Sequence, residues 1–509
     1  MGNGGGIKKW ITENKTAMVA VVTALTFAVF NSIMISKDFF LLMTIPLLGL
    51  LVVLFTFKIE TALLITALLT PFAIDIALIP KMELSIPVEP MMILFSGIFI
   101  FRILVAKTYD TAILKHPVGI SIMAMLGWML ITSITSEMPM VSFKYLAARI
   151  WFMIPFFFAA TQIFKSTKRI RQFFWCYAFS LIVVILISTI KTVSNFSDLQ
   201  TLHRVMKPFY NDHTAYGVAI GLFVPVAFYF AIEKHRNPLI KVLSIVALGI
   251  LVMGLIFSYS RAAWISVVGA IAVYYAIKFG MKIKWMLVIA SVGVALFFTY
   301  QADVLYKLGK NNQDSSYNLA DQVRSISNIS TDASNVERLN RWASALRMFE
   351  ERPLVGWGPG TYQFIYGKYQ RSYQLSTIST NSGNLGNAHS EYIGPLADEG
   401  VMGTVLVVLV FGFSFATGIK VYRTAYDKSV ANMALAFTLG LFTYYVHGIF
   451  NNFLDTDKLS VPFWGFTAAL VALDLYFPKK EKQLTNEDKQ LQQKMVDITS
   501  ENEKNNNIL

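Results

Sequence analysis

Apolar residues are gathered along this chain into long windows that short polar segments separate. Each window holds about 17 to 25 residues, the length of helix that crosses a hydrocarbon layer about 30 Å thick. About fourteen windows are present, and they are centred near residues 26, 48, 70, 97, 127, 154, 182, 222, 249, 270, 292, 405, 440 and 468. The pattern predicts an all-α, polytopic integral membrane protein with about 12 to 14 transmembrane helices in the lipid bilayer.

Composition supports this class. Of the 509 residues, 55% are hydrophobic and 15% are charged, whereas a soluble domain carries about 25% charged residues. The net charge of +13 is typical of basic cytoplasmic loops in a membrane protein, so we expect no nucleic-acid partner. The single cysteine, Cys176, lies inside a window and excludes a disulfide framework. The stretch before the first window lacks the cleavage site of a signal peptide, so we expect no cleavage there.

The distribution of basic residues predicts the topology. With the N-terminus in the cytoplasm, every second connection is basic, and the alternate connections, such as "TSEMPMVS", are poor in Lys and Arg. We therefore expect both termini in the cytoplasm. The basic connections contain Lys58; Arg102, Lys107 and Lys115; Lys165, Lys168, Arg169 and Arg171; Lys234, Arg236 and Lys241; Lys278, Lys282 and Lys284; and Lys420, Arg423 and Lys428.

One connection is far longer than the others and divides the chain. We expect N-terminal transmembrane helices over residues 1–302, an outer loop over 303–389, C-terminal transmembrane helices over 390–478, and a cytoplasmic, disordered tail over 479–509. The loop contains "SNVERLNRWASALRMFEERP", whose apolar residues recur at helical spacing, and we predict an amphipathic helix on the membrane surface or over the bundle. Its apolar stripe consists of Leu339, Trp342, Ala343, Leu346 and Phe349.

Candidate chemistry gathers on the outer side. His389 ends the large loop, immediately before a long apolar run, so we place it at the outer boundary of the membrane. A helix-capping or interfacial role for this ring stays open. Arg261 lies in a short outer connection, Arg149 lies inside an apolar window, and Arg338 and Arg341 share the polar side of the loop helix. Each arginine alone could be structural, but together they predict an anion site that suits phosphate oxygens.

Other motifs carry weaker predictions. We interpret "GWGPG", residues 356–360, as a turn, because no strand precedes it and no Lys-Ser/Thr pair follows. The "DTD" of residues 455–457 could bind a divalent ion, although so short a pattern is frequent by chance. The six histidines are dispersed and one cysteine cannot build a thiolate site, so we expect no metal site and no cofactor.

The histidine segment resembles a known family. His389 and Ser390, nine further residues, and then Gly400 to Gly403 resemble the H-[NSQ]-x9-G-x-x-[GTY] pattern of bacterial O-antigen ligases. "YSRAAW" and "ERLNRWASALRMFEERPLVGWGPGTY" are similar in style to segments of the same family, and the resemblance covers about residues 210 to 450. The broader family includes O-antigen polymerases and protein O-oligosaccharyltransferases.

The resemblance implies a GT-C-like glycosyltransferase of the bacterial inner membrane. Its donor would be a glycan on undecaprenyl diphosphate, and its acceptor a sugar hydroxyl of the lipid A–core on the periplasmic face. His389 would be the general base of a metal-independent, inverting transfer. Arg261, with Arg338 or Arg341, would hold the diphosphate, and Arg149 would contribute from the bundle.

Three other functions stay open at this stage. An O-antigen polymerase or a protein O-oligosaccharyltransferase shares the donor chemistry and differs in the acceptor. A transporter of polysaccharide or lipid would have repeated halves and charges at mid-bilayer, but the sequence has no evident repeat. The glycan, the acceptor sugar and the oligomeric state are not readable from the sequence.

Overall fold

The computed structural model describes residues 15–35, 44–79, 82–194, 204–234, 237–282, 333–375 and 386–480, with residues 285, 288, 292 and 379 between them. The expected tail beyond residue 480 and the larger part of the window near 292 lie outside the described residues. In the described part, ten helices are long and apolar enough to cross a membrane. This confirms a polytopic all-α membrane protein.

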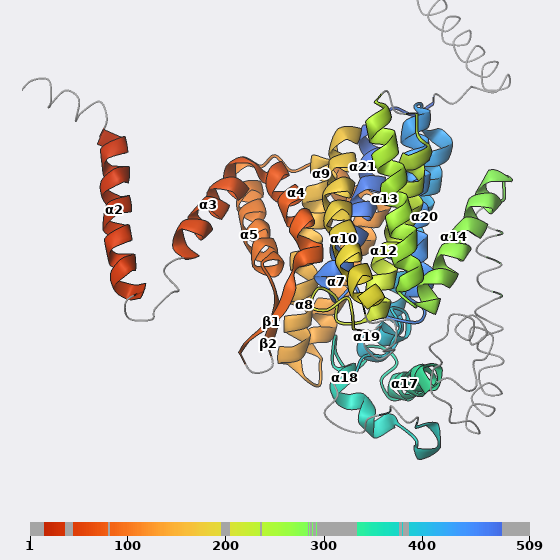
Figure 1. Ribbon diagram of the computed structural model, residues 1–509. Coiled ribbons are helices and arrows are strands. Elements are labelled where there is room, and N and C mark those ends of the chain that lie inside the picture. Colours follow the sequence, from red (N-terminus) through yellow and green to blue (C-terminus); the bar gives the residue numbers. More distant parts are fainter. Residues whose placement is uncertain are drawn as a thin grey trace, which may run out of the picture.

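The ten candidate spans form one bundle (Figure 1). One of them runs from Pro139 to Ile163 and joins α8 (Pro139–Met153), the π-helical turn η3 (Ile154–Ala159) and α9 (Ala160–Ile163). The others are α5 (Val88–Ala106), α7 (Pro117–Ile134), α10 (Thr167–Ser194), α12 (His213–Ile232), α13 (Pro238–Phe257), α14 (Arg261–Lys278), α19 (Ile393–Thr424), α20 (Lys428–His447) and α21 (Asp457–Tyr476).

The first three windows give apolar helices that are not among the ten candidate spans. They are α2 (Lys15–Ile35), α3 (Thr44–Phe57) and α4 (Ile59–Leu69), and α4 continues into the 3-10 turn η2 (Thr70–Phe72). With 14 and 11 residues, α3 and α4 rise only about 21 and 17 Å, too little for one crossing each. The count of fourteen windows therefore exceeds the ten candidate spans of the described part. Figure 1 shows α2 apart from the bundle.

A β-hairpin and a short helix connect the early helices. Strands β1 (Ile74–Ile79) and β2 (Met82–Ile86) pair antiparallel, and α6 (Ala112–Lys115) precedes α7.

Helix α21 forms the centre of the bundle. Its residues from Asp457 to Asp474 are all buried, and between the charged residues at its two ends the helix is apolar around most of its circumference, as is typical of a central helix. Trp464 is fully buried at its middle. Aromatic rings pack around this helix, and Phe223 of α12 stacks on Tyr177 of α10 at 4.8 Å between ring centroids. The central position of α21 fixes the ends of α19 and α20 that carry the candidate site.

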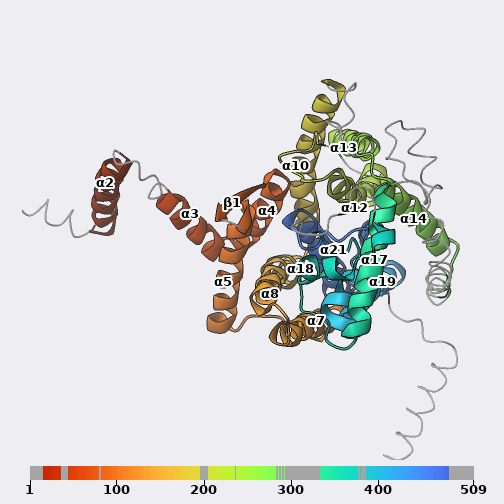
Figure 2. The ribbon, with the colours of Figure 1, turned by 90° about the horizontal axis from the view of Figure 1, so that it is seen from below.

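The described part of the large loop lies over one end of the bundle. It contains α17 (Ala333–Glu351), α18 (Tyr362–Ile365), and the 3-10 turns η4 (Tyr366–Tyr369) and η5 (Ser372–Gln374). Figure 2 shows α17 lying across α19.

Helix α17 packs more tightly than its amphipathic pattern predicts. Leu339 and Trp342 pack against Ile393 and Phe450 of the bundle. Ala345 and Met348 are fully buried in a second cluster. The expected polar side of α17 is also covered, because the loop packs against it.

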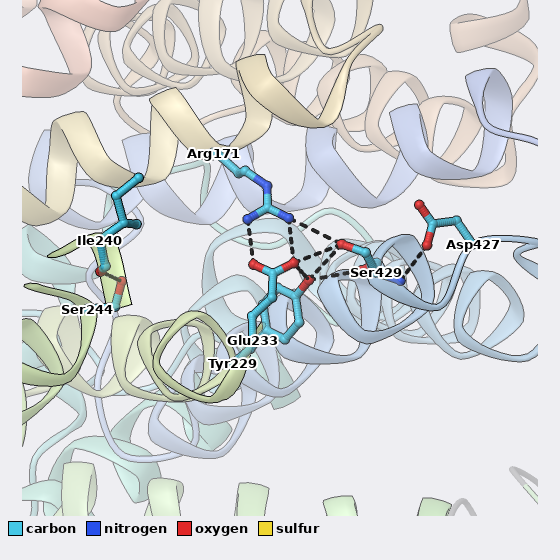
Figure 3. Close-up of polar contacts among 7 residues, drawn as sticks. All are labelled: Arg171, Tyr229, Glu233, Ile240, Ser244, Asp427 and Ser429. Carbon is cyan, nitrogen blue, oxygen red and sulfur yellow. Dashed lines mark hydrogen bonds and ion pairs between the residues drawn. The ribbon is translucent and has the colours of Figure 1, made fainter. Parts of the chain in front are cut away.

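An ion pair joins the helices at the opposite end of the bundle (Figure 3). Arg171 of α10 donates to both carboxylate oxygens of Glu233, which follows α12, at 2.5 and 2.6 Å. Tyr229 and Ser429 donate to Glu233 at 2.7 and 2.9 Å. Asp427 accepts from the Ser429 amide at 2.8 Å and caps α20. These contacts join α10, α12 and α20.

Candidate functional site

His389 lies in a tight turn just before α19. Its φ is +49°, a left-handed conformation that L-residues with a large side chain rarely adopt. The His389 amide donates to Asn387 Oδ1 at 3.1 Å, and Trp342 Nε1 donates to the His389 carbonyl at 3.4 Å. The side chain is half-buried. A strained backbone that its neighbours hold in place is common at functional sites.

The surroundings of His389 keep its ring neutral. Burial, followed by the positive charges of Arg338 and Arg341, lowers the pKa of His389 from 6.5 to about 3, and Asp212 opposes this shift. The structure therefore places Arg338 and Arg341 close enough to His389 for their charges to act on its ring. A neutral imidazole at pH 7 has a lone pair that can accept a proton.

Arg341 is braced by several contacts. Its Nε donates to Glu337 Oε1 at 2.7 Å, and one terminal nitrogen donates to the Asn387 carbonyl at 3.3 Å. Its guanidinium lies 4.6 Å from the centroid of the Tyr366 ring. Arg341 is only 6% exposed, whereas Arg338, one turn earlier, is half-buried. Arg341 thus holds the turn before His389, and Arg338 is the more accessible of the two cations.

Arg261 opens α14 at the same end of the bundle, directly after the capping residue Ser260. The backbone of the next residue, Ala262, lies near the ring of His447. His447 is fully buried at the end of α20. The charges of Arg338 and Asp212 act on His447 as they do on His389. The first turn of α14 therefore adjoins the group of charges around His389.

Arg149 lies on another side of the His389 turn. It is 8% exposed and donates to the Leu454 carbonyl and the Tyr145 hydroxyl. Glu391 and Asp455 are its charged neighbours. Asp455 is open to solvent on one side, but the protein around it desolvates the carboxyl and raises its pKa to about 6. Arg149 thus has two acidic neighbours, Glu391 and Asp455, that the arginines of α17 do not share.

The other positions of the histidine motif have structural roles. The Ser390 hydroxyl accepts from the amides of Tyr392 and Ile393 at 3.3 Å each and so holds the turn that leads into α19. Gly400 has φ +72° and kinks α19, and a Cβ there would lie 2.2 Å from the Leu354 carbonyl oxygen. A Cβ on Gly403 would lie 2.4 Å from the Cβ of Glu399. Both glycines therefore permit close approach of backbone or side chain.

The "GWGPG" segment is a turn, as predicted, and this part of the loop is hydrogen-bonded to Asp398 of α19. The amides of Gly360 and Tyr362 donate to the Asp398 carboxylate at 3.0 and 2.8 Å. The Gly358 amide donates to the Asp398 carbonyl at 2.7 Å. These bonds attach the large loop to the start of α19.

The two aspartates of the "DTD" segment interact with different residues. Asp457 pairs with Lys458 at 3.3 Å, while Asp455 interacts with Arg149 and Glu391. Within the described ranges, no group of three or more His, Cys, Asp or Glu side chains could hold a metal ion.

Comparison with protein families identifies the region that carries this site. Residues 246–408 match the family described as O-antigen ligase. The match confirms the resemblance seen in the sequence, and it includes His389, Arg261, Arg338 and Arg341, while Arg149 lies outside it. No curated protein matches the chain. The family match supports a function of the O-antigen ligase and polymerase type.

Sequence reasoning missed three residues around His389. Asp212 acts on His389, and the charges of Arg338 and Asp212 act on His447. Glu391 makes the buried contacts described below. The sequence contained a weak sign of Glu391, because an acid at the start of a long apolar run needs a partner. Asp212 and His447 are far from His389 in the sequence, so only the fold could place them.

Proposed function

We propose that this protein is a glycosyltransferase of the bacterial inner membrane with its site on the periplasmic face. It would transfer a glycan of the O-antigen type from undecaprenyl diphosphate to a sugar hydroxyl of the lipid A–core. The observation that carries the proposal is the neutral His389, held in a strained turn beside Arg338 and Arg341. The O-antigen ligase match over residues 246–408 supports this assignment.

In this mechanism His389 is the general base. The acceptor oxygen attacks the anomeric carbon of the donor sugar, and His389 takes the hydroxyl proton as the new C–O bond forms. The bond between the anomeric carbon and the diphosphate oxygen breaks, and undecaprenyl diphosphate leaves with the electron pair. One displacement inverts the configuration at the anomeric carbon. The energy comes from the sugar–diphosphate bond, so the reaction needs no nucleotide and no cofactor.

The arginines neutralise the charge that grows on the diphosphate. Arg338 is the more accessible cation, and Arg341 is braced by Glu337 in a fixed position. Arg261 would reach the diphosphate from the first turn of α14, whose helix dipole also favours an anion. Arg149 supports the site from the bundle through the Leu454 carbonyl. Fixed cations of this kind stabilise a departing phosphate and replace a divalent metal in that role.

Binding of the donor would also raise the pKa of His389. A bound diphosphate offsets the charges of Arg338 and Arg341, which lower the pKa of His389 in the empty site. The ring then holds the acceptor proton more readily. The base would therefore become effective only when the donor is in place.

A transfer assay with purified protein tests the proposal. The donor is a glycan on undecaprenyl diphosphate, and the acceptors, offered separately, are lipid A–core, a second donor molecule and a pilin-like protein. Every reaction is run with and without chelator. We expect transfer to lipid A–core that chelator does not affect. Transfer only to the second donor would make the protein a polymerase, and transfer only to protein would make it an oligosaccharyltransferase. No transfer to any acceptor would favour a transporter.

A further inference from the structure

We propose that Glu391 is a positioning residue that fixes the catalytic turn of His389. The inference rests on the proposed function of His389 as the base. Glu391 lies two residues after His389 and is 4% exposed. Charged side chains are rarely buried this deeply unless hydrogen-bond donors surround them.

One carboxylate oxygen of Glu391 collects three donors. Oε1 accepts from the Tyr444 hydroxyl at 2.5 Å and from the amides of Phe453 and Leu454 at 2.9 Å each. The Phe453 amide also donates to the Tyr444 hydroxyl at 3.1 Å. Hydrogen bonds to a carboxylate are stronger than bonds between neutral groups. Glu391 therefore ties the start of α19 to the turn between α20 and α21.

The backbone makes the same connection a second time. The Glu391 amide donates to the Gly448 carbonyl at 2.8 Å. Gly448 directly follows α20. The turn with the left-handed His389 is thus held from its C-terminal side by residues 448–454, while Trp342 of α17 holds the His389 carbonyl.

Glu391 also links His389 to Arg149. The Leu454 amide donates to Glu391, and the Leu454 carbonyl accepts from Arg149. Leu454 therefore connects the carboxylate of Glu391 to the buried guanidinium of Arg149. A displacement of the base by about 1 Å can reduce the rate about 100-fold, so an anchor this close to His389 controls the reaction without touching substrate.

The contacts of Glu391 favour anchoring over proton transfer. The side chain is almost completely buried, and three donors already occupy Oε1. A glutamine keeps an oxygen that accepts the same bonds but cannot act as a base. The substitutions E391Q and E391A therefore separate the two roles.

The experiment measures kcat, the KM for donor, and the melting temperature in detergent for wild type, E391Q, E391A and Y444F. We expect E391A to lower kcat about 100-fold, E391Q to keep kcat within about tenfold of wild type, and Y444F to lower kcat about two- to tenfold. The donor KM stays within about twofold in each, because the diphosphate contacts lie on other residues. Y445F is the matched control: its hydroxyl does not contact Glu391, and its kcat stays at the wild-type value.

Each remaining outcome overturns a stated claim. Folded E391Q as inactive as E391A would show that the charge of Glu391 takes part in the reaction, against a positioning role. Wild-type kcat in both Y444F and E391Q, or a folded E391A with wild-type kcat, would also overturn the inference. If E391A fails to fold, Y444F and E391Q decide alone. Absence of transfer by the wild type itself would overturn the proposed function and this inference with it.

Discussion

At the end of the bundle where α10 begins, Arg171 meets both oxygens of Glu233, whereas at the other end Arg338 and Arg341 act on the ring of His389. Burial disfavours the charged form of Glu233, but the hydrogen bonds from Arg171 and Tyr229, with the charge of Arg171, outweigh it and lower the pKa of this carboxyl to about 2. At the α17 end, burial and the arginines lower the pKa of His389 to about 3.

The two ends use the same cation for different purposes. A bidentate pair between Arg171 and Glu233 cancels charge and fastens three helices. The positive charge of Arg338 and Arg341 is still strong enough to act on a histidine, even though Glu337 braces Arg341. The first arrangement joins helices, and under the proposed function the second attracts an anion and keeps a neutral base beside it. Four experiments test this distinction.

Removal of the His389 imidazole should have the largest effect on kcat. We expect His389→Ala to lower kcat about 10²- to 10⁴-fold, the range that a general base contributes. Transfer to lipid A–core is measured at saturating donor, and the melting temperature is measured in the same detergent. A folded variant with wild-type kcat would exclude His389 as the base.

Removal of Arg338 should be next in size. We expect Arg338→Ala to lower kcat/KM about 100-fold, because a fixed cation near the leaving group is lost. Arg338→Lys keeps the charge but loses the guanidinium fork, so it should recover only part of the activity. Full activity in the lysine variant would argue against bidentate contact with the diphosphate.

The matched substitution of Arg171, at the end of the bundle with the Arg171–Glu233 pair, should lower stability and not kcat. Arg171→Ala leaves the half-buried Glu233 without its guanidinium, and we expect about 2 kcal/mol of lost stability. The kcat of the folded fraction should stay close to wild type, since α12 spans about 30 Å between Glu233 and the site. Equal loss of kcat in this variant and in Arg338→Ala would remove the distinction between the two ends.

The pH dependence of stability should differ by a smaller amount. The pKa of His389 falls from 6.5 in the unfolded chain to about 3 in the fold, so the unfolded chain binds the extra proton between these values. Stability attributable to His389 is present above pH 6.5 and is lost as the pH falls toward 3. The melting temperature of wild type should rise relative to that of His389→Gln as the pH is raised from 4 to 7. Parallel curves would contradict the low pKa.

The sequence predicted the class of fold and indicated several residues of the candidate site, for identifiable reasons. Hydropathy predicts helices because the bilayer imposes their length, and "GWGPG" was recognisable as a turn because glycine permits positive φ. His389 and the loop arginines were evident from their position beside an apolar run. Asp212, which acts on His389, and His447, which Arg338 and Asp212 also affect, were not evident, because only the packing of α12 and α20 places them there. The sequence placed Arg338 and Arg341 alike on the polar side of the loop helix, and it did not show that Arg341 is buried.

The most direct test of the account is the pH profile of kcat/KM for wild type, Arg338→Gln and Arg171→Gln. We expect the acid limb of the wild type well below pH 6.5, because burial and the arginines hold His389 neutral. Arg338→Gln should move this limb upward by the share that Arg338 contributes, while burial keeps it below 6.5, and Arg171→Gln should not move it. An acid limb near 6.5 in all three proteins would contradict the claim that the α17 arginines set the basicity of His389.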